Sequence, residues 1–157
     1  MRDDIIDILM LRNPQVMTTG FNRPNLYFGV QSPKDKYATM VNYLERHKGE
    51  SGIIYCLTRK VVEEVCGQLI REGFSVTRYH AGLSDSERRH NQEDFIYDRA
   101  QIMVATNAFG MGIDKSNVRF VVHYNMPKNM ESYYQEAAGQ EMVNPQSASF
   151  CTAARMW

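Results

Sequence analysis

The sequence predicts a three-layer α/β protein in which helices cover both faces of a mainly parallel sheet. Short apolar runs alternate with amphipathic segments of helical length, which is the pattern of βαβ units. Several of these runs are continuously apolar, as is typical of strands covered on both faces. A parallel sheet of this kind carries its functional loops beyond the carboxyl ends of its strands.

The first expected elements lie before residue 53. Acidic residues followed by apolar ones at helical spacing predict a helix over 3–11, which Asn13-Pro14 ends. Residues 25–30 have strand character. Residues 34–47 carry an apolar stripe at helical spacing, and the glycine-containing segment 49–52 predicts a turn out of that helix.

The core begins with Ile53–Leu57, a short apolar run that predicts a strand covered on both faces. A helix over 61–72 follows, with Ile70 among the residues expected to face inward and Gly73 closing it. Residues 74–79 then predict the second core strand.

The remaining elements repeat the alternation. Ser84, with Glu87 three residues later, predicts a helix that opens with a capping box. Strands are expected at 102–106 and 118–124, and a last helix around 129–136.

Composition limits the class of protein. The chain has 157 residues, 18 Lys and Arg against 18 Asp and Glu, and 43% hydrophobic residues, as expected of one globular domain. No apolar run is long enough to span a bilayer and the first residues lack signal-peptide character, so we expect a cytoplasmic (bacterial nucleoid) or nuclear protein without membrane partners. Zero net charge disfavours a polybasic coat but allows a local phosphate-binding surface.

The three cysteines show no metal-ligand or disulfide pattern. Cys56, Cys66 and Cys151 have no C-x-x-C spacing and cannot all pair, so we expect no metal site. They are interpreted as reduced thiols, the first two of them buried.

Polar residues follow the ends of three predicted core strands. Thr58 and Arg59 follow the first, His80 and Gly82 the second, and Thr106 the third. The carboxyl ends of parallel strands meet at one sheet edge, so these loops should lie side by side. Hydroxyls, an arginine and glycine N–H groups together can hold successive phosphates.

Each residue also has a plain structural explanation. Thr58 and Ser84 could simply be helix caps, and Arg59 a solvated charge. Gly110 and Gly112 could simply form a tight turn. The chain has no G-x-x-x-x-G-K-[ST] loop and no acidic Walker-type pair, so alone it has no means of holding a triphosphate and magnesium.

Distinctive strings occur in order along the chain. They are SGIIYCLTR at 51–59, YHAGL at 79–83, IMVATNAFGMGIDK at 102–115, VRFVVH at 118–123 and SYYQE at 132–136. Together they resemble the second RecA-like motor lobe of RecQ-family DNA helicases. The resemblance covers residues 1–137 and includes helicase motif IV, motif V and the opening of motif VI.

The resemblance implies a function. The parent protein would be an ATP-dependent 3'-5' DNA helicase that unwinds duplex DNA in repair and recombination, with ATP and Mg²⁺ held between this lobe and a first RecA-like lobe. Single-stranded or partly duplex DNA would contact Thr58, Arg59, His80, Gly82 and Thr106. Gly112, Asp114 and Gln135 would face the nucleotide cleft.

The sequence departs from the family inside motif VI. After residue 137 the family pattern calls for G-R-A-G-R-D-G, whereas residues 138–143 read AGQEMV and lack both arginines. Codons for Glu141 onward, read two bases later, give Asp then Gly and can continue into family-like sequence. We therefore expect 138–157 to be an aberrant, frameshifted tail, with a divergent or vector-derived tail as the alternative.

Without those arginines the isolated chain is expected to be catalytically inactive and to bind no cofactor alone. The alternative is a stand-alone single-stranded nucleic-acid-binding or regulatory module. A small-molecule α/β enzyme is disfavoured, because the chain offers neither a nucleophile nor a complete cofactor loop. Exposure of the face that meets the first lobe could promote self-association.

Overall fold

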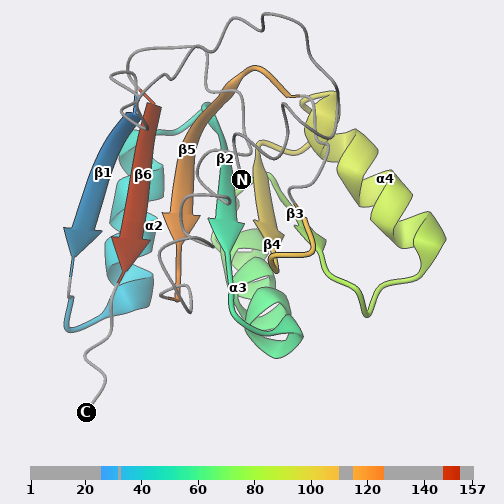
Figure 1. Ribbon diagram of the computed structural model, residues 1–157, viewed down its shortest axis with the longest axis horizontal. Helices are drawn as coiled ribbons and strands as arrows, with labels where there is room; N and C mark the ends of the chain where they lie inside the picture. The colour runs from blue at the N-terminus through green and yellow to red at the C-terminus, as the bar shows by residue number, and fades with distance from the viewer. Residues whose placement is uncertain (1–25, 32, 110–114, 126–146, 153–157) are drawn as a thin grey trace, which may run out of the picture.

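The computed structural model describes residues 26–31, 33–109, 115–125 and 147–152. Within them, six strands form one sheet in the order β1-β6-β5-β2-β4-β3, and every neighbouring pair is parallel (Figure 1). The elements are β1 (Leu26–Gln31), α2 (Lys36–Arg46), β2 (Ser51–Tyr55), α3 (Arg59–Arg71), β3 (Val76–Tyr79), α4 (Asp85–Ile96), β4 (Ile102–Ala105), β5 (Val118–His123) and β6 (Ser147–Thr152).

Two apolar clusters fill the space between the sheet and its helices. On one face, residues of α2 and α3, among them Met40 and Leu69, pack with Ile54, Val104 and Phe120 of the sheet. On the other face, strand residues whose side chains point the opposite way, among them Ile53 and Met103, pack with Phe95 of α4 and with Phe109. Alternate residues of each strand therefore face different helices, which confirms the three-layer α/β fold expected from the sequence.

Each described helix begins at a polar cap. Asp35 and Thr58 accept hydrogen bonds from backbone N–H groups in the first turns of α2 and α3. Ser84 and Glu87 form the expected capping box at the start of α4. These caps satisfy N–H groups that have no partner within the helix, so the chain fixes where each helix starts.

The first core strand lies two residues earlier than expected. β2 begins at Ser51, inside the segment expected to turn, and it ends at Tyr55. Gly52 pairs with Ile102 of β4 and Phe120 of β5 within the sheet. The Phe120 ring occupies the space that a side chain at this position would take, so the strand requires glycine here. Leu57, expected at the strand end, is 55% exposed, and Ile70, expected to face inward, is 54% exposed.

Residues 147–152 form a strand that the sequence did not indicate. β6 pairs with β1 on one side and β5 on the other, within the segment expected to be an aberrant tail. Main-chain hydrogen bonds on both sides can hold a strand that lacks an apolar pattern. The out-of-frame origin stays a prediction about the coding DNA, and the expected helices at 3–11 and 129–136 lie outside the described residues.

No helix in the described ranges has the length and apolar character needed to cross a membrane.

Candidate functional site

The strand order brings three loops to one edge of the sheet. β4 lies between β2 and β3, and all three strands run in the same direction, so their carboxyl ends meet at the edge where the arrowheads lie in Figure 1. The loops after these strands carry Thr58 and Arg59, Thr106, and His80 and Gly82 respectively. The expected convergence of these loops is present.

The loop after β2 presents an exposed hydroxyl and an exposed guanidinium. Thr58 Oγ1 accepts a hydrogen bond from the Val61 N–H at 3.3 Å, so its own hydroxyl hydrogen can still be donated. Arg59 is the first residue of α3 and is exposed, and no carboxylate of the described residues pairs with it. The Leu57 N–H donates to Asn125 Oδ1 at 3.2 Å, which ties the loop to the end of β5.

His80 is held inside the loop after β3. It is 5% exposed, and both of its ring nitrogens have partners in the chain. Nε2 lies 2.7 Å from Glu63 Oε1, and Nδ1 accepts the Gly82 N–H at 3.1 Å. Because Nδ1 is an acceptor, the ring proton is on Nε2 and is donated to Glu63.

Glu63 is a site residue that the sequence did not reveal. It lies on α3, and Oε1 accepts a second hydrogen bond from Arg78 Nε on β3 at 2.8 Å. One carboxylate therefore joins the helix to two residues at the end of the edge strand. A glutamate in the first half of an amphipathic helix gives no signal of this, because most such residues only face solvent.

Gly82 lies directly against Arg59. A methyl group placed on Gly82 would be 3.2 Å from Arg59 Cδ and Nη1 and 3.1 Å from His80 Nδ1. Such contacts are tight, so glycine at this position permits the arginine and histidine to pack on one side of the turn.

Backbone and side-chain hydrogen bonds anchor the loop after β4. The Thr106 N–H donates to the Tyr79 carbonyl at 3.2 Å and the Phe109 N–H to the Thr106 carbonyl at 3.0 Å. The buried Phe109 ring lies 4.9 Å from the Tyr79 ring, and the Tyr55 hydroxyl donates to the Phe109 carbonyl at 3.0 Å. The expected nucleotide-facing residues Gly112, Asp114 and Gln135 lie outside the described residues.

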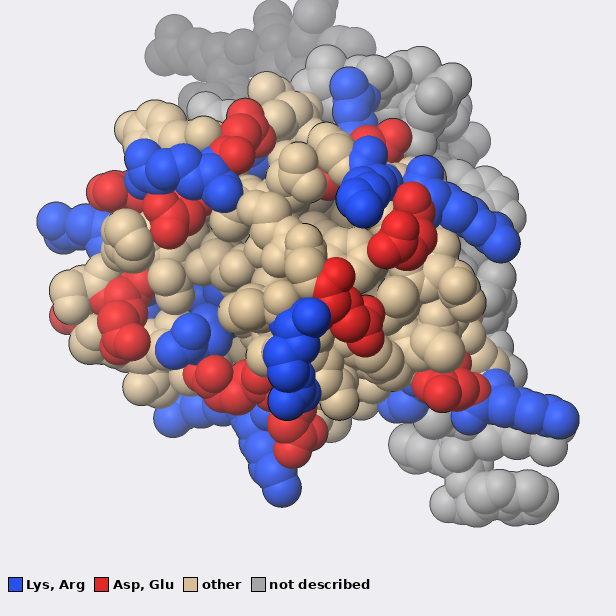
Figure 2. All heavy atoms as spheres, turned by 180° about the vertical axis from the view of Figure 1, so that it is seen from behind, with Lys and Arg blue, Asp and Glu red and all other residues tan. Residues whose placement is uncertain are grey.

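Charge on one face of the molecule is mixed. Figure 2 shows basic and acidic side chains side by side on the face turned away from the view of Figure 1. This face therefore offers no uniformly basic surface for phosphate recognition. Within the described part of the chain, no group of three or more His, Cys, Asp or Glu side chains could hold a metal ion.

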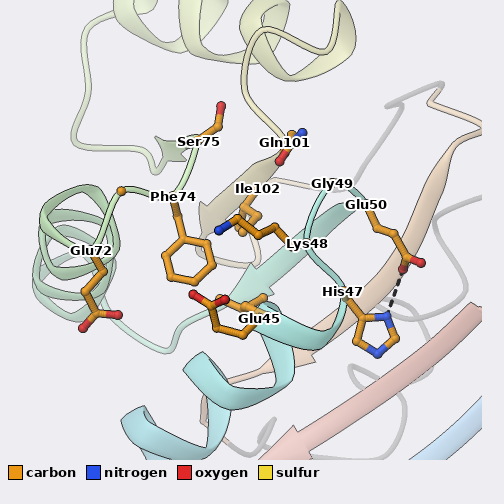
Figure 3. Close-up of a pocket in the computed structure, with 12 residues that line it drawn as sticks. Glu45, His47, Lys48, Gly49, Glu50, Glu72, Phe74, Ser75, Gln101 and Ile102 are labelled. Carbon is orange, nitrogen blue, oxygen red and sulfur yellow. Dashed lines mark hydrogen bonds and ion pairs between the residues drawn. The ribbon is translucent and has the colours of Figure 1, made fainter.

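A small pocket lies at the opposite edge of the sheet from these loops. It has a volume of about 120 Å³ and lies between the carboxyl ends of α2 and α3 and the start of β4. Figure 3 shows Phe74 and Ile102 beside Lys48 and Glu45, with His47 bonded to Glu50 at 3.0 Å. Both charge signs and apolar atoms line it, so its chemistry favours no particular ligand.

Comparison with known proteins places these loops in a family. Residues 35–138 match the model of the helicase conserved C-terminal domain. The chain is 47% identical over 135 residues to the ATP-dependent DNA helicase RecQ of Bacillus subtilis, covering 86% of this chain and 23% of that protein. It is 46% identical over 141 residues to the ATP-dependent helicase wrn-1 of Caenorhabditis elegans, covering 86% and 13% respectively.

A solved structure has the same fold. Dbp5 of S. cerevisiae, bound to RNA and ADP BeF3, matches with a TM-score of 0.73 at 21% identity, over 99% of this chain and 42% of that one. The chain thus spans less than a quarter of the two helicases named above and under half of Dbp5.

Proposed function

Since the chain belongs to the helicase conserved C-terminal domain family and corresponds to that lobe of RecQ-family DNA helicases, we propose that it supplies DNA-phosphate contacts within an ATP-dependent 3'-5' DNA helicase. The observation that carries the proposal is the convergence of the loops after β2, β3 and β4 on one edge of the sheet. Among them is the guanidinium of Arg59, which pairs with no carboxylate of the described residues. Duplex unwinding in repair and recombination, beside DNA in the nucleoid or nucleus, belongs to the parent protein under this proposal.

The proposed contacts divide by chemistry. Arg59 provides the charged contact and Thr58 a hydroxyl donor, while Thr106 holds its loop beside them. His80 and Gly82 use their ring nitrogens and N–H group within the chain, so their contribution is to shape the surface against which a strand lies. Backbone phosphates, rather than bases, are the natural ligand for these groups, since none is an aromatic platform.

The second part of the proposal concerns ATP. Gly112, Asp114 and Gln135 would form one wall of the ATP cleft. The first lobe would supply the acidic ligands of magnesium and the phosphate-binding lysine. Because residues 138–143 lack the motif VI arginines, we infer that the isolated chain hydrolyses no ATP. A DNA-stimulated ATPase rate above background for the purified chain would contradict this.

Binding to a fluorescent single-stranded oligonucleotide, titrated with salt, tests the DNA contact. Each phosphate contact adds about −0.7 to the slope of log K against log salt. R59A should remove one phosphate contact, so the slope should become less negative by about 0.7. K60A is the matched control, because Lys60 is the next residue along, is 85% exposed and lies 3.8 Å from Glu64. Equal losses in the two variants, or no binding of the unaltered chain at low salt, would overturn the proposal.

A further inference from the structure

We propose that Glu63 is a positioning residue, which fixes the His80 tautomer and thereby holds the turn against which Arg59 packs; the inference rests on the proposed DNA-binding function. The contacts form a continuous chain. Glu63 Oε1 accepts a hydrogen bond from His80 Nε2 at 2.7 Å, and His80 Nδ1 accepts one from the Gly82 N–H at 3.1 Å. Gly82 in turn lies against Arg59.

The first link sets the tautomer. A neutral imidazole has one donor and one acceptor nitrogen, and a nearby carboxylate selects the tautomer that places the proton on Nε2. That choice leaves Nδ1 free to accept the Gly82 N–H. Without Glu63, the Nδ1–H tautomer would point its proton at the Gly82 N–H, and the turn would lose its internal hydrogen bond.

Burial makes the link rigid. The His80 side chain is 7% exposed, while Glu63 is 46% exposed and is held in place by Arg78 Nε at 2.8 Å. Water can therefore replace Glu63 only poorly as an acceptor for the buried ring. Arg78 in turn orients the carboxylate, so the position of the ring is set by α3 and β3 together.

The last link reaches Arg59, the proposed phosphate contact. Because Gly82 has no side chain, Arg59 Cδ and Nη1 lie close to the place where a methyl group would be. The turn thus forms a wall for the guanidinium. A fixed donor loses less conformational freedom on binding than a mobile one, so the wall strengthens binding by holding the Arg59 guanidinium in place.

The proposal predicts a change opposite in sign to simple electrostatics. Removing a negative charge beside a phosphate site should strengthen binding, and Glu64, 57% exposed on the same helix, is the matched control for that effect. We expect E64A to bind an oligonucleotide at least as tightly as the unaltered chain. E63A should bind roughly fivefold more weakly, the factor expected for loss of one net hydrogen bond, and E63Q should retain binding because its amide oxygen still accepts from His80.

The tautomer is measured independently of DNA. Long-range ¹H–¹⁵N correlation spectra of the 157-residue chain should show the His80 proton on Nε2 in the unaltered protein and in E63Q, and a mixture of tautomers with a shifted Gly82 amide in E63A. G82A should weaken oligonucleotide binding because the added methyl group would crowd both Arg59 and His80 Nδ1. The Nε2–H tautomer should persist in G82A, because Glu63 still accepts a hydrogen bond from Nε2.

The two readouts separate the possible failures. An Nδ1–H or doubly protonated His80 in the unaltered chain would overturn the inference even if E63A did not fold, as would an E63A spectrum identical to that of E64A. The inference would also be overturned if E64A bound the oligonucleotide as weakly as E63A does. Absence of oligonucleotide binding with the expected spectra would overturn the proposed function and leave the positioning of the turn established.

Discussion

The ion pair between buried Lys115 and half-exposed Asp98 offers a quantitative test of how this fold is stabilised. The Lys115 side chain is 2% exposed and its Nζ lies 2.6 Å from Asp98 Oδ1 and 5.0 Å from the centre of the Phe95 ring. The carboxylate is 56% exposed and also accepts hydrogen bonds from Asn117 and Ser51. The buried partner of the pair is therefore the cation, and the two residues should not tolerate substitution equally.

D98N is the informative variant. Asp98 has a φ of 57°, and asparagine tolerates this left-handed conformation well, so the backbone is unperturbed. The change leaves a buried ammonium with the Ile96 carbonyl at 3.4 Å and a neutral amide. Breaking a fully buried pair costs about 3–5 kcal/mol and an exposed pair about 0–1 kcal/mol, so a half-exposed carboxylate should cost about 2–3 kcal/mol.

K115M should cost about 1 kcal/mol or less, because methionine fills the apolar space and Asp98 remains solvated and bonded to Asn117. The double variant should resemble K115M, since no buried charge remains. Urea unfolding at pH 7, with slopes compared between variants, measures all three free energies. If K115M costs as much as D98N, or if the two losses simply add, the buried cation does not govern this region.

The pH dependence has a definite sign. The hydrogen bond from Lys115, followed by that from Asn117, holds the pKa of Asp98 below its usual range. The stabilisation from the carboxylate is complete above the unfolded-state pKa of about 3.9 and is lost as pH falls through the lower folded-state value. D98N and the unaltered chain should therefore converge in stability only at strongly acid pH.

Three further substitutions and one reagent test other parts of the fold. G52A should destabilise the chain by about 1–3 kcal/mol because a methyl group would overlap a neighbouring ring, whereas G67A, in open space on α3, should stabilise it by about 0.5–1 kcal/mol; urea unfolding of the pair would refute the reasoning if both had the same sign. S84A should lower the free energy of unfolding by about 1 kcal/mol through loss of the capping box, and an unchanged value would show that the cap is dispensable. Burial raises the pKa of the Cys56 thiol to about 12 and that of Cys66 to about 11, so both should resist iodoacetamide at pH 8 until urea is added; peptide mass spectrometry showing rapid labelling of the folded chain would contradict this.

Local sequence signals specified much of the architecture. The capping box at Ser84, the cap at Thr58 and the continuous apolar runs each act within a few residues, so they could be read without knowledge of the fold. The meeting of the loops after β2, β3 and β4 also followed from the parallel topology.

Contacts between distant segments could not be read in the same way. Gly52 is required in β2 because the Phe120 ring fills its side-chain space, and Glu63 belongs to the site because of His80 and Arg78. The pattern around each residue is compatible with a turn or a solvated helix face. Only the packing of separate elements distinguishes these possibilities, which is why the roles of the glycine and the glutamate became evident from the structure.

The position of β2 in the sheet has a consequence for synthesis on the ribosome. Its hydrogen-bonding neighbours, β4 and β5, both follow it in the chain, beginning at Ile102 and Val118. At about 5–20 residues per second, the apolar β2 segment waits several seconds before both partners have been made. During that interval it resembles an unpaired edge open to other chains, so this lobe should depend on chaperones more during translation than after its release.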